Sequence, residues 1–188
     1  MSANGIPDGL RIDPPWHTHG ACDGIVGKIG ADKESQMWTF PDRGGRAVCL
    51  VSEATGMIQE LWNGGWSQSM AKPARLFYVA RCYRYERPGR GRYREFTQFG
   101  IEILGTPDQA DHREAVALLR MCLDDLGIDY DVKDRVRRGI GYYVEDGFEV
   151  ECPGLNLQRQ IAGGGRYREG VGWGIGIDRL LLVMTPDA

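Results

Sequence analysis

The residues in this sequence best suited to chemistry are six arginines in the stretch RCYRYERPGRGRYREFTQFGIEILG, residues 81–105. They lie between Arg81 and Arg94 and surround one carboxylate, Glu86. Planar guanidinium groups bind phosphate oxygens through paired hydrogen bonds, and several of them together suit a polyphosphate. A solvated, charged hairpin is the commoner role for a loop of this composition. The cluster therefore predicts a polyphosphate site, with a surface hairpin as the alternative.

Two long strands are expected to position the arginines. Residues 75–86 and 94–105 are rich in β-forming side chains, and the turn-forming sequence RPGRG separates them at 87–91. These segments predict an antiparallel pair with an arginine-rich tip. The long side chains at or just past this turn, which could close over a bound ligand, are those of Arg90, Arg92 and Arg94.

Strand alternation gives this pair a polar face and an apolar face, because successive side chains point to opposite sides. Arg84 and Glu86 share one face of the first strand, and Gln98 and Glu102 share one face of the second. We expect the apolar side chains of the second strand to pack against a helix on the other side. These apolar residues are Phe99, Ile101 and Ile103.

Residues 36–51 predict a second hairpin, because two β-rich runs flank the turn formers of DRGG. Residues 108–128 predict the one long helix, with Asp108 or Asp111 as N-cap and Gly127 as its stop. The apolar face expected of this helix consists of Val116, Leu119, Leu123 and Leu126.

The C-terminal third reads as further strands and a helix. Residues 141–151 and 155–167 are strand-like, and alternating glycines from Gly170 to Gly176 precede an apolar run that should become helical near Ile177. The sequence therefore predicts an α+β fold, a mostly antiparallel β-sheet flanked by a few helices. We expect residues 1–188 to form a single domain.

Composition limits the function. Lys and Arg total 23 against 26 Asp and Glu, and the net charge of −3 gives no overall field that gathers nucleic acid or an anionic membrane. No apolar run approaches the roughly 20 residues of a spanning helix, and the N-terminus lacks signal-peptide features, so we expect a cytoplasmic protein. Five widely spaced cysteines favour reduced thiols. His17, His19 and Cys22 lack a second ligand pair, which favours a polar loop over a metal site.

Four segments resemble a known family. RYERPGRGRYREFTQFGIEILG resembles motif 2 of class II aminoacyl-tRNA synthetases, in the form found in the histidyl branch. LVSEAT at 50–55 resembles the Arg-Pro-Glu-x-Thr segment of that branch, and RRGIGYYVEDGFE at 137–149 resembles its Arg-Gly-x-x-Tyr-Tyr signature. GGGRY and GWGIGIDRLLL resemble the approach to motif 3 and motif 3 itself. The resemblance covers roughly residues 9 to 184 and implies a class II synthetase-like catalytic fold.

The resemblance implies a site that activates an amino-acid carboxylate with ATP and Mg²⁺. Arg84 matches the arginine that holds the α-phosphate, and Glu86 matches the carboxylate that reads the adenine amine. Arg92 and Arg179 match the pair that holds the γ-phosphate from two sides. Arg138 matches the arginine placed at the reacting carboxylate and the α-phosphate.

The same resemblance implies a histidine pocket. Glu53, Thr55 and Gln98 match residues that hold the α-amino and carboxylate groups. A buried carboxylate and a tyrosine hydroxyl can pair with the two nitrogens of an imidazole ring. The residues that match the surroundings of the imidazole are Glu102, Tyr142, Tyr143 and Tyr167.

Several positions differ from the family pattern. Val51 and Ser52 replace an Arg-Pro pair, Gly141 replaces an aspartate, and Arg168 follows the Gly-Gly-Arg-Tyr segment in place of an aspartate. Gly141 and Arg168 are expected beside the amino-acid pocket, which opens the question of substrate identity. From the spacing of these segments we also expect this sequence to lack the family's insertion domain, its anticodon-binding domain and most of the motif 1 helix.

These features leave three interpretations. The first is an adenylate-forming ligase that activates histidine or a related amino acid and passes it to an acceptor other than whole tRNA, such as a carrier protein or a small metabolite. The second is a non-catalytic paralogue that senses an amino acid or nucleotide and regulates a partner. The third, less favoured, is the trimmed catalytic core of a full synthetase. The resemblance also predicts a homodimer, paired through the strand near Pro14 and Pro15.

Overall fold

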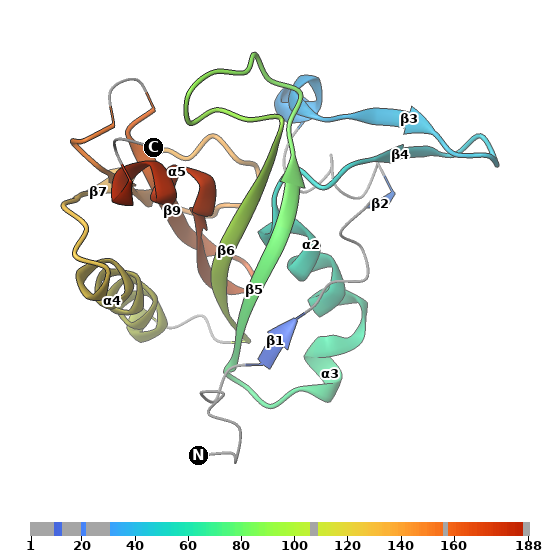
Figure 1. Ribbon diagram of the computed structural model, residues 1–188. Coiled ribbons are helices and arrows are strands. Elements are labelled where there is room, and N and C mark those ends of the chain that lie inside the picture. Colours follow the sequence, from blue (N-terminus) through green and yellow to red (C-terminus); the bar gives the residue numbers. More distant parts are fainter. Residues whose placement is uncertain (1–9, 13–19, 22–30, 106–108, 156–157, 186–188) are drawn as a thin grey trace.

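The computed structural model describes residues 10–12, 20–21, 31–105, 109–155 and 158–185. A seven-stranded sheet forms its centre, in the spatial order β1-β5-β6-β10-β9-β8-β7 (Figure 1). Only β1 runs parallel to its neighbour, β5, and every other neighbouring pair is antiparallel. The strands are β1 (Leu10–Ile12), β5 (Ala74–Tyr83), β6 (Glu95–Leu104), β7 (Asp131–Val136), β8 (Gly147–Glu151), β9 (Gln160–Tyr167) and β10 (Gly170–Gly176).

Helices cover both faces of this sheet. Figure 1 shows helices α4 (Gln109–Asp125) and α5 (Ile177–Met184) beside the sheet. They pack with β6, β9 and β10 around Trp173 and Phe148. On the other side, α2 (Ala54–Leu61) packs its buried Ile58 against β5. It continues through a π-helical turn (Trp62–Trp66) into α3 (Ser67–Ser69). The predicted α+β architecture, with an antiparallel sheet between helices, is confirmed.

A small second sheet, in the order β2-β4-β3, lies beside the main one. Strands β3 (Thr39–Pro41) and β4 (Ala47–Cys49) form the hairpin predicted at 36–51, and β2 (Gly20–Ala21) pairs with β4. Asp42 accepts backbone hydrogen bonds from Gly44 and Arg46 across the turn. A 3₁₀ helix (Ala31–Gln36) precedes β3.

The predicted long helix is α4, and its expected apolar face packs on the sheet except at Leu126, with Val116 only partly buried. Leu119 and Leu123 are buried, and Ala115 joins them; its carbonyl accepts a 2.7 Å hydrogen bond from the indole of Trp173. Leu126 is exposed, contrary to the prediction, because the helix ends at Asp125 before a turn. That turn has Gly127 at φ 65°, a conformation that suits glycine.

The paired strands on either side of the arginine cluster and the start of α5 at Ile177 are also as predicted. Other elements differ. The strand expected from residue 141 begins only at Gly147, because residues 141–146 form turns, and β7 was not predicted. Strand β7 contains a bulge at Arg135, whose φ is 56°. The N-cap candidate Asp108 lies outside the described residues.

The predicted loop of His17, His19 and Cys22 and the pairing strand near Pro14 and Pro15 also lie outside the described residues. Within the described part of the chain, no group of three metal-ligating side chains comes together. The cysteines there are free thiols at Cys49, Cys82, Cys122 and Cys152. No described helix is long and apolar enough to cross a membrane.

Candidate active site

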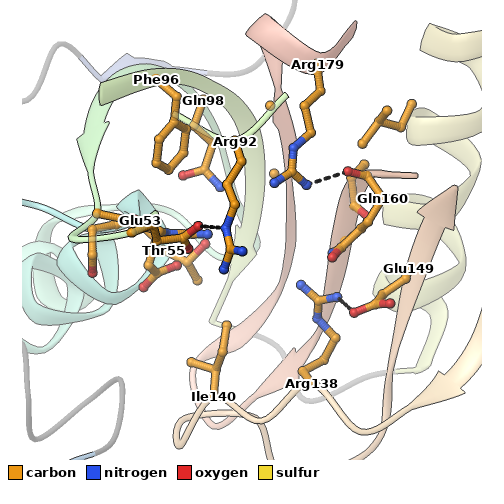
Figure 2. A pocket seen from close by; sticks show the side chains of 18 of the residues that line it. Glu53, Thr55, Arg92, Phe96, Gln98, Arg138, Ile140, Glu149, Gln160 and Arg179 are labelled. Carbon is orange, nitrogen blue, oxygen red and sulfur yellow. Dashed lines mark hydrogen bonds and ion pairs between the residues drawn. The ribbon is translucent and has the colours of Figure 1, made fainter. Parts of the chain in front are cut away.

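A polar cavity of about 320 Å³ opens on the sheet face that α2 also covers. Its walls come from the arginine-rich loop between β5 and β6, the N-terminal end of α2, strands β6, β9 and β10, the start of α5 and the loop that carries Tyr142 (Figure 2). Ten of the twelve predicted site residues line it. These ten are Glu53, Thr55, Arg84, Glu86, Arg92, Gln98, Arg138, Tyr142, Tyr143 and Arg179.

Three of the four lining arginines lie near one another in the cavity wall. Arg84 follows β5, Arg92 lies in the arginine-rich loop, and Arg179 lies in the first turn of α5. Burial lowers the pKa of the Arg179 guanidinium, and the neighbouring positive charges of Arg84 and Arg92 lower it further. Cations held together against their own repulsion form a site that favours an anion.

Arg179 also fixes the arginine-rich loop in place. Its Nε donates to the carbonyl of Gly91 at 2.6 Å, and its Nη1 donates to the carbonyl of Gln160 at 2.7 Å. Nη2 reaches Oε1 of Gln158 at 3.4 Å. One guanidinium therefore joins the loop tip to β9.

Each of the other arginines has its own set of contacts. Arg84 donates from Nε to the carbonyl of Ser52 at 3.0 Å, and its guanidinium carbon lies 4.9 Å from the ring centroid of Phe96. Arg92 forms an ion pair with Glu86 (Figure 2 shows Arg92). Arg84 thus contacts a carbonyl and an aromatic ring, without a carboxylate partner among the described residues.

Arg138 forms an ion pair with Glu149 of β8, and both line the cavity (Figure 2). The Arg138 side chain is only 11% exposed, and its Nε is buried without a hydrogen-bond partner among the described residues. The sequence placed Arg138 in the site, but it gave no sign of Glu149. The pairing depends on β8 lying beside the loop that carries Arg138, and this proximity comes from the tertiary fold.

The N-terminal end of α2 carries the groups predicted to hold the α-amino and carboxylate ends of the amino acid. Glu53 is the N-cap of this helix. Its carboxylate accepts a 2.8 Å hydrogen bond from the backbone nitrogen of Gly56 and a 2.9 Å hydrogen bond from the hydroxyl of Tyr142. Burial raises the pKa of the Glu53 carboxyl, and these hydrogen bonds oppose the increase. Gln98 accepts a 3.2 Å hydrogen bond from the nitrogen of Ala54.

Glu102 and Tyr167, predicted beside the imidazole, do not line the cavity, and their place near the side chain of the amino acid stays a prediction. Glu102 is fully buried, and it accepts from the hydroxyls of Thr55 at 2.7 Å and Tyr167 at 2.5 Å. Burial raises the pKa of the Glu102 carboxyl to about 8. Tyr142, Tyr143 and Thr55 form the surface in front of them.

Glycines make room for these side chains on the sheet. A Cβ added at Gly172 would lie 1.7 Å from Oε2 of Glu102, and one at Gly174 would lie 2.2 Å from Nε2 of Gln98. Real Cβ atoms do not approach other atoms so closely. The glycines that alternate along β10 therefore leave space for side chains from β6.

The positions that differ from the family pattern lie at different depths. Gly141 and Arg168 are exposed and do not line the cavity, although each adjoins a predicted site residue, Tyr142 and Tyr167. Ser52 does line it, and Val51 belongs to the core. Arg94 lies over the rings of Trp38 and Tyr85, at 5.6 and 5.3 Å, and is not part of the cavity wall.

Solved structures place this fold in a class. A pyrrolysyl-tRNA synthetase from Desulfitobacterium hafniense matches 95% of this chain and 61% of its own, with a TM-score of 0.73 at 22% identity. An ATP phosphoribosyltransferase regulatory subunit/histidyl-tRNA synthetase from Bacillus halodurans matches 94% of this chain and 74% of its own, with a TM-score of 0.78 at 15% identity. The chain has the catalytic fold of class II aminoacyl-tRNA synthetases.

The sequence comparisons define the family. The histidyl-tRNA synthetase family model matches residues 12–133. A histidine–tRNA ligase from Desulforudis audaxviator is 36% identical over 139 residues, which cover 73% of this chain. The chain belongs to the histidyl-tRNA synthetase family, and the match spans 30% of the length of that relative.

Proposed function

We propose that this protein is an adenylate-forming ligase that activates histidine, or a histidine-like amino acid, with ATP. The observation that supports this most directly is the grouping of Arg84, Arg92 and Arg179 in the wall of one cavity that Glu53 and Thr55 also line. A triphosphate suits the first group, and an amino acid suits the second. Arg138 comes from the loop that also carries Tyr142, and its guanidinium lies over Gly163 of β9 in the cavity wall. From there it could contact both the α-phosphate and the amino-acid carboxylate.

In the reaction, an amino-acid carboxylate oxygen attacks the α-phosphorus in line and pyrophosphate leaves. Arg84 would bind the α-phosphate, and Arg92 and Arg179 would bind the γ-phosphate. Arg138 would hold the attacking carboxylate beside the α-phosphate. Two anions must meet, so fixed guanidinium groups and alignment supply most of the acceleration. The step needs no nucleophilic side chain.

Glu86 and Arg92 pair with each other without ligand, so ATP would replace this ion pair with one new contact for each side chain. Glu86 would then accept from the adenine amine, and Arg92 would contact phosphate. Glu53 and Gln98 would hold the α-amino and carboxylate groups of the amino acid, and Tyr143 would face its side chain.

Mg²⁺ would accompany the ATP. It commonly binds through one or two protein oxygens, phosphate oxygens and water. Asp178 fits this role because it is a lining carboxylate without an arginine ion pair among the described residues, and Gln160 adds an amide oxygen. When bound, the ion would neutralise charge on the phosphates.

We further propose that the amino acid is passed to an acceptor other than whole tRNA, such as a carrier protein or a small metabolite. The net charge of −3 supplies no general attraction for nucleic acid. Family membership supports a homodimer, and the composition supports a cytoplasmic location.

The test is amino-acid-dependent exchange of labelled pyrophosphate into ATP, with all twenty standard amino acids and histidine analogues. We expect exchange with one amino acid, lowered about a hundredfold or more in Arg138→Ala. Absence of exchange from a protein that binds ATP or histidine by calorimetry would overturn the enzyme proposal.

That negative result would favour a second candidate, a sensor or regulatory subunit that binds an amino acid or nucleotide. The similarity in fold to the ATP phosphoribosyltransferase regulatory subunit/histidyl-tRNA synthetase from Bacillus halodurans supports it. Fold similarity of this kind does not distinguish catalysis from binding.

A further inference from the structure

Two paired strands hold Arg138 in a fixed position. Glu149 of β8 and Gly163 of β9 lie directly opposite each other in the strand register. Glu149 binds Nη1 of Arg138, and a Cβ added at Gly163 would lie 2.6 Å from both Nη1 and Nη2. The guanidinium therefore lies across Gly163 with one edge fixed by the carboxylate.

This arrangement leaves one part of the guanidinium for a ligand. Nε is buried without a partner, and Nη1 is engaged by Glu149. Among the described residues, Nη2 has no hydrogen-bond partner. In Figure 2 the guanidinium of Arg138 extends from its loop toward the cavity side on which Arg179 lies. Nη2 is thus the donor available to an anion.

We infer that Glu149 is a positioning residue for the proposed adenylation, one that acts through Arg138 without touching the substrate. Partly buried charge-assisted bonds fix geometry more strongly than exposed ones, and the two side chains are 11% and 23% exposed. The inference rests on the proposed function. It assigns to Glu149 the task of aiming Nη2 at the oxygen shared by the reacting carboxylate and the α-phosphate.

The carboxylate has an opposing effect on binding. The negative charge of Glu149 weakens the attraction of Arg138 for a phosphate anion, because it offsets part of the positive charge of the guanidinium and repels the anion. Glu149 should therefore lower the affinity for pyrophosphate while it raises the rate of the chemical step. Replacing a residue that only supported β8 would not raise the pyrophosphate affinity while lowering the rate of the chemical step.

The experiment compares Glu149→Gln and Glu149→Asp with Glu95→Gln. The control removes the carboxylate of an exposed arginine pair, Arg81 with Glu95, on the same sheet. Calorimetry with inorganic pyrophosphate measures affinity, and pyrophosphate exchange measures kcat and KM. For Glu149→Gln we expect about threefold to tenfold tighter pyrophosphate binding and a kcat about tenfold to a hundredfold lower.

We expect Glu149→Asp to recover part of kcat and Glu95→Gln to match the unchanged protein. The tighter binding of Glu149→Gln should also disappear when Arg138→Ala is present. The inference about Glu149 would be overturned if Glu149→Gln kept the kcat of the original protein, or if it lost pyrophosphate affinity and kcat together. Exchange by the original protein would still uphold the proposed function in that case. No exchange by the unchanged protein would overturn both, and the binding comparison would show whether Glu149 still controls the anion affinity of Arg138.

Discussion

Gln98 joins the middle of the sheet to the N-terminal end of α2, because its Oε1 accepts from the backbone nitrogen of Ala54. It can lie there only because residue 174 on the neighbouring strand is glycine. A Cβ at Gly174 would lie 2.2 Å from Nε2 of Gln98 and 2.9 Å from its Cδ. The position of Gln98, which we propose contacts the amino acid, therefore depends on a residue that contributes no side chain.

Gly174→Ala is expected to displace the Gln98 side chain and to weaken binding of the amino acid. Overpacking of this kind costs about 1 to 3 kcal/mol of stability. We expect calorimetry to show at least about tenfold weaker binding of histidine, equivalent to about 1.4 kcal/mol. Gly154→Ala is the matched control, since a Cβ there meets nothing within 4 Å. Equal affinities in the two variants would contradict the role of Gly174.

Tyr142→Phe removes the hydroxyl that donates to Glu53. The buried carboxyl would lose one of its two hydrogen bonds, which should lower the free energy of unfolding by about 1 to 3 kcal/mol. Urea unfolding at neutral pH measures this loss, and histidine binding should weaken with it. The exposed Tyr85→Phe serves as control. Unchanged stability of Tyr142→Phe would show that water replaces the hydroxyl.

Glu102 predicts a pH dependence of stability. Its pKa is about 8 in the folded protein, above the ordinary value of 4.5, so the folded state holds a proton that the unfolded state releases between these values. Stability should therefore decrease as pH rises from about 4.5 to 8 and should level off above 8. Glu102→Gln cannot titrate, and it should remove this contribution.

Urea unfolding of both proteins between pH 5 and 9 would test this. The difference in the free energy of unfolding should move in favour of Glu102→Gln as pH rises, by on the order of several kcal/mol. Glu95→Gln, at an exposed site, should show no such trend. A pH-independent difference between Glu102→Gln and the unchanged protein would mean that the hydroxyls of Thr55 and Tyr167 fully stabilise the charged carboxylate.

Sequence patterns predicted the elements that have a strong local period. The alternating glycines and apolar run gave the start of α5 at Ile177, and the β-rich runs around the arginines gave β5 and β6. Helix α2 was missed because its N-cap is Glu53, whereas Ser, Thr, Asp and Asn are the usual signals. Family resemblance, not periodicity, placed Glu53 in the site.

The depth of each side chain was harder to predict than its presence near the site. Glu102 and Gln98 share a face of β6, yet Thr55 covers Glu102 while Gln98 reaches the cavity. Gly141 and Arg168 are near site residues in sequence but exposed in space. The place of Glu149 beside Arg138 could be recognised only from the register of β8 with β9. These relations arise from tertiary packing, which a single sequence does not encode in any local period.

Arg179→Lys tests whether the guanidinium of Arg179 holds the arginine-rich loop as well as phosphate. Lysine keeps the charge but cannot donate at once to Gly91, Gln160 and Gln158, because its donors converge on one atom. We expect faster amide hydrogen exchange in residues 87–94 and about tenfold weaker ATP binding. Arg113→Lys, at an exposed position of α4, is the control. Weaker ATP binding with unchanged exchange in the loop would show that Arg179 acts on phosphate alone.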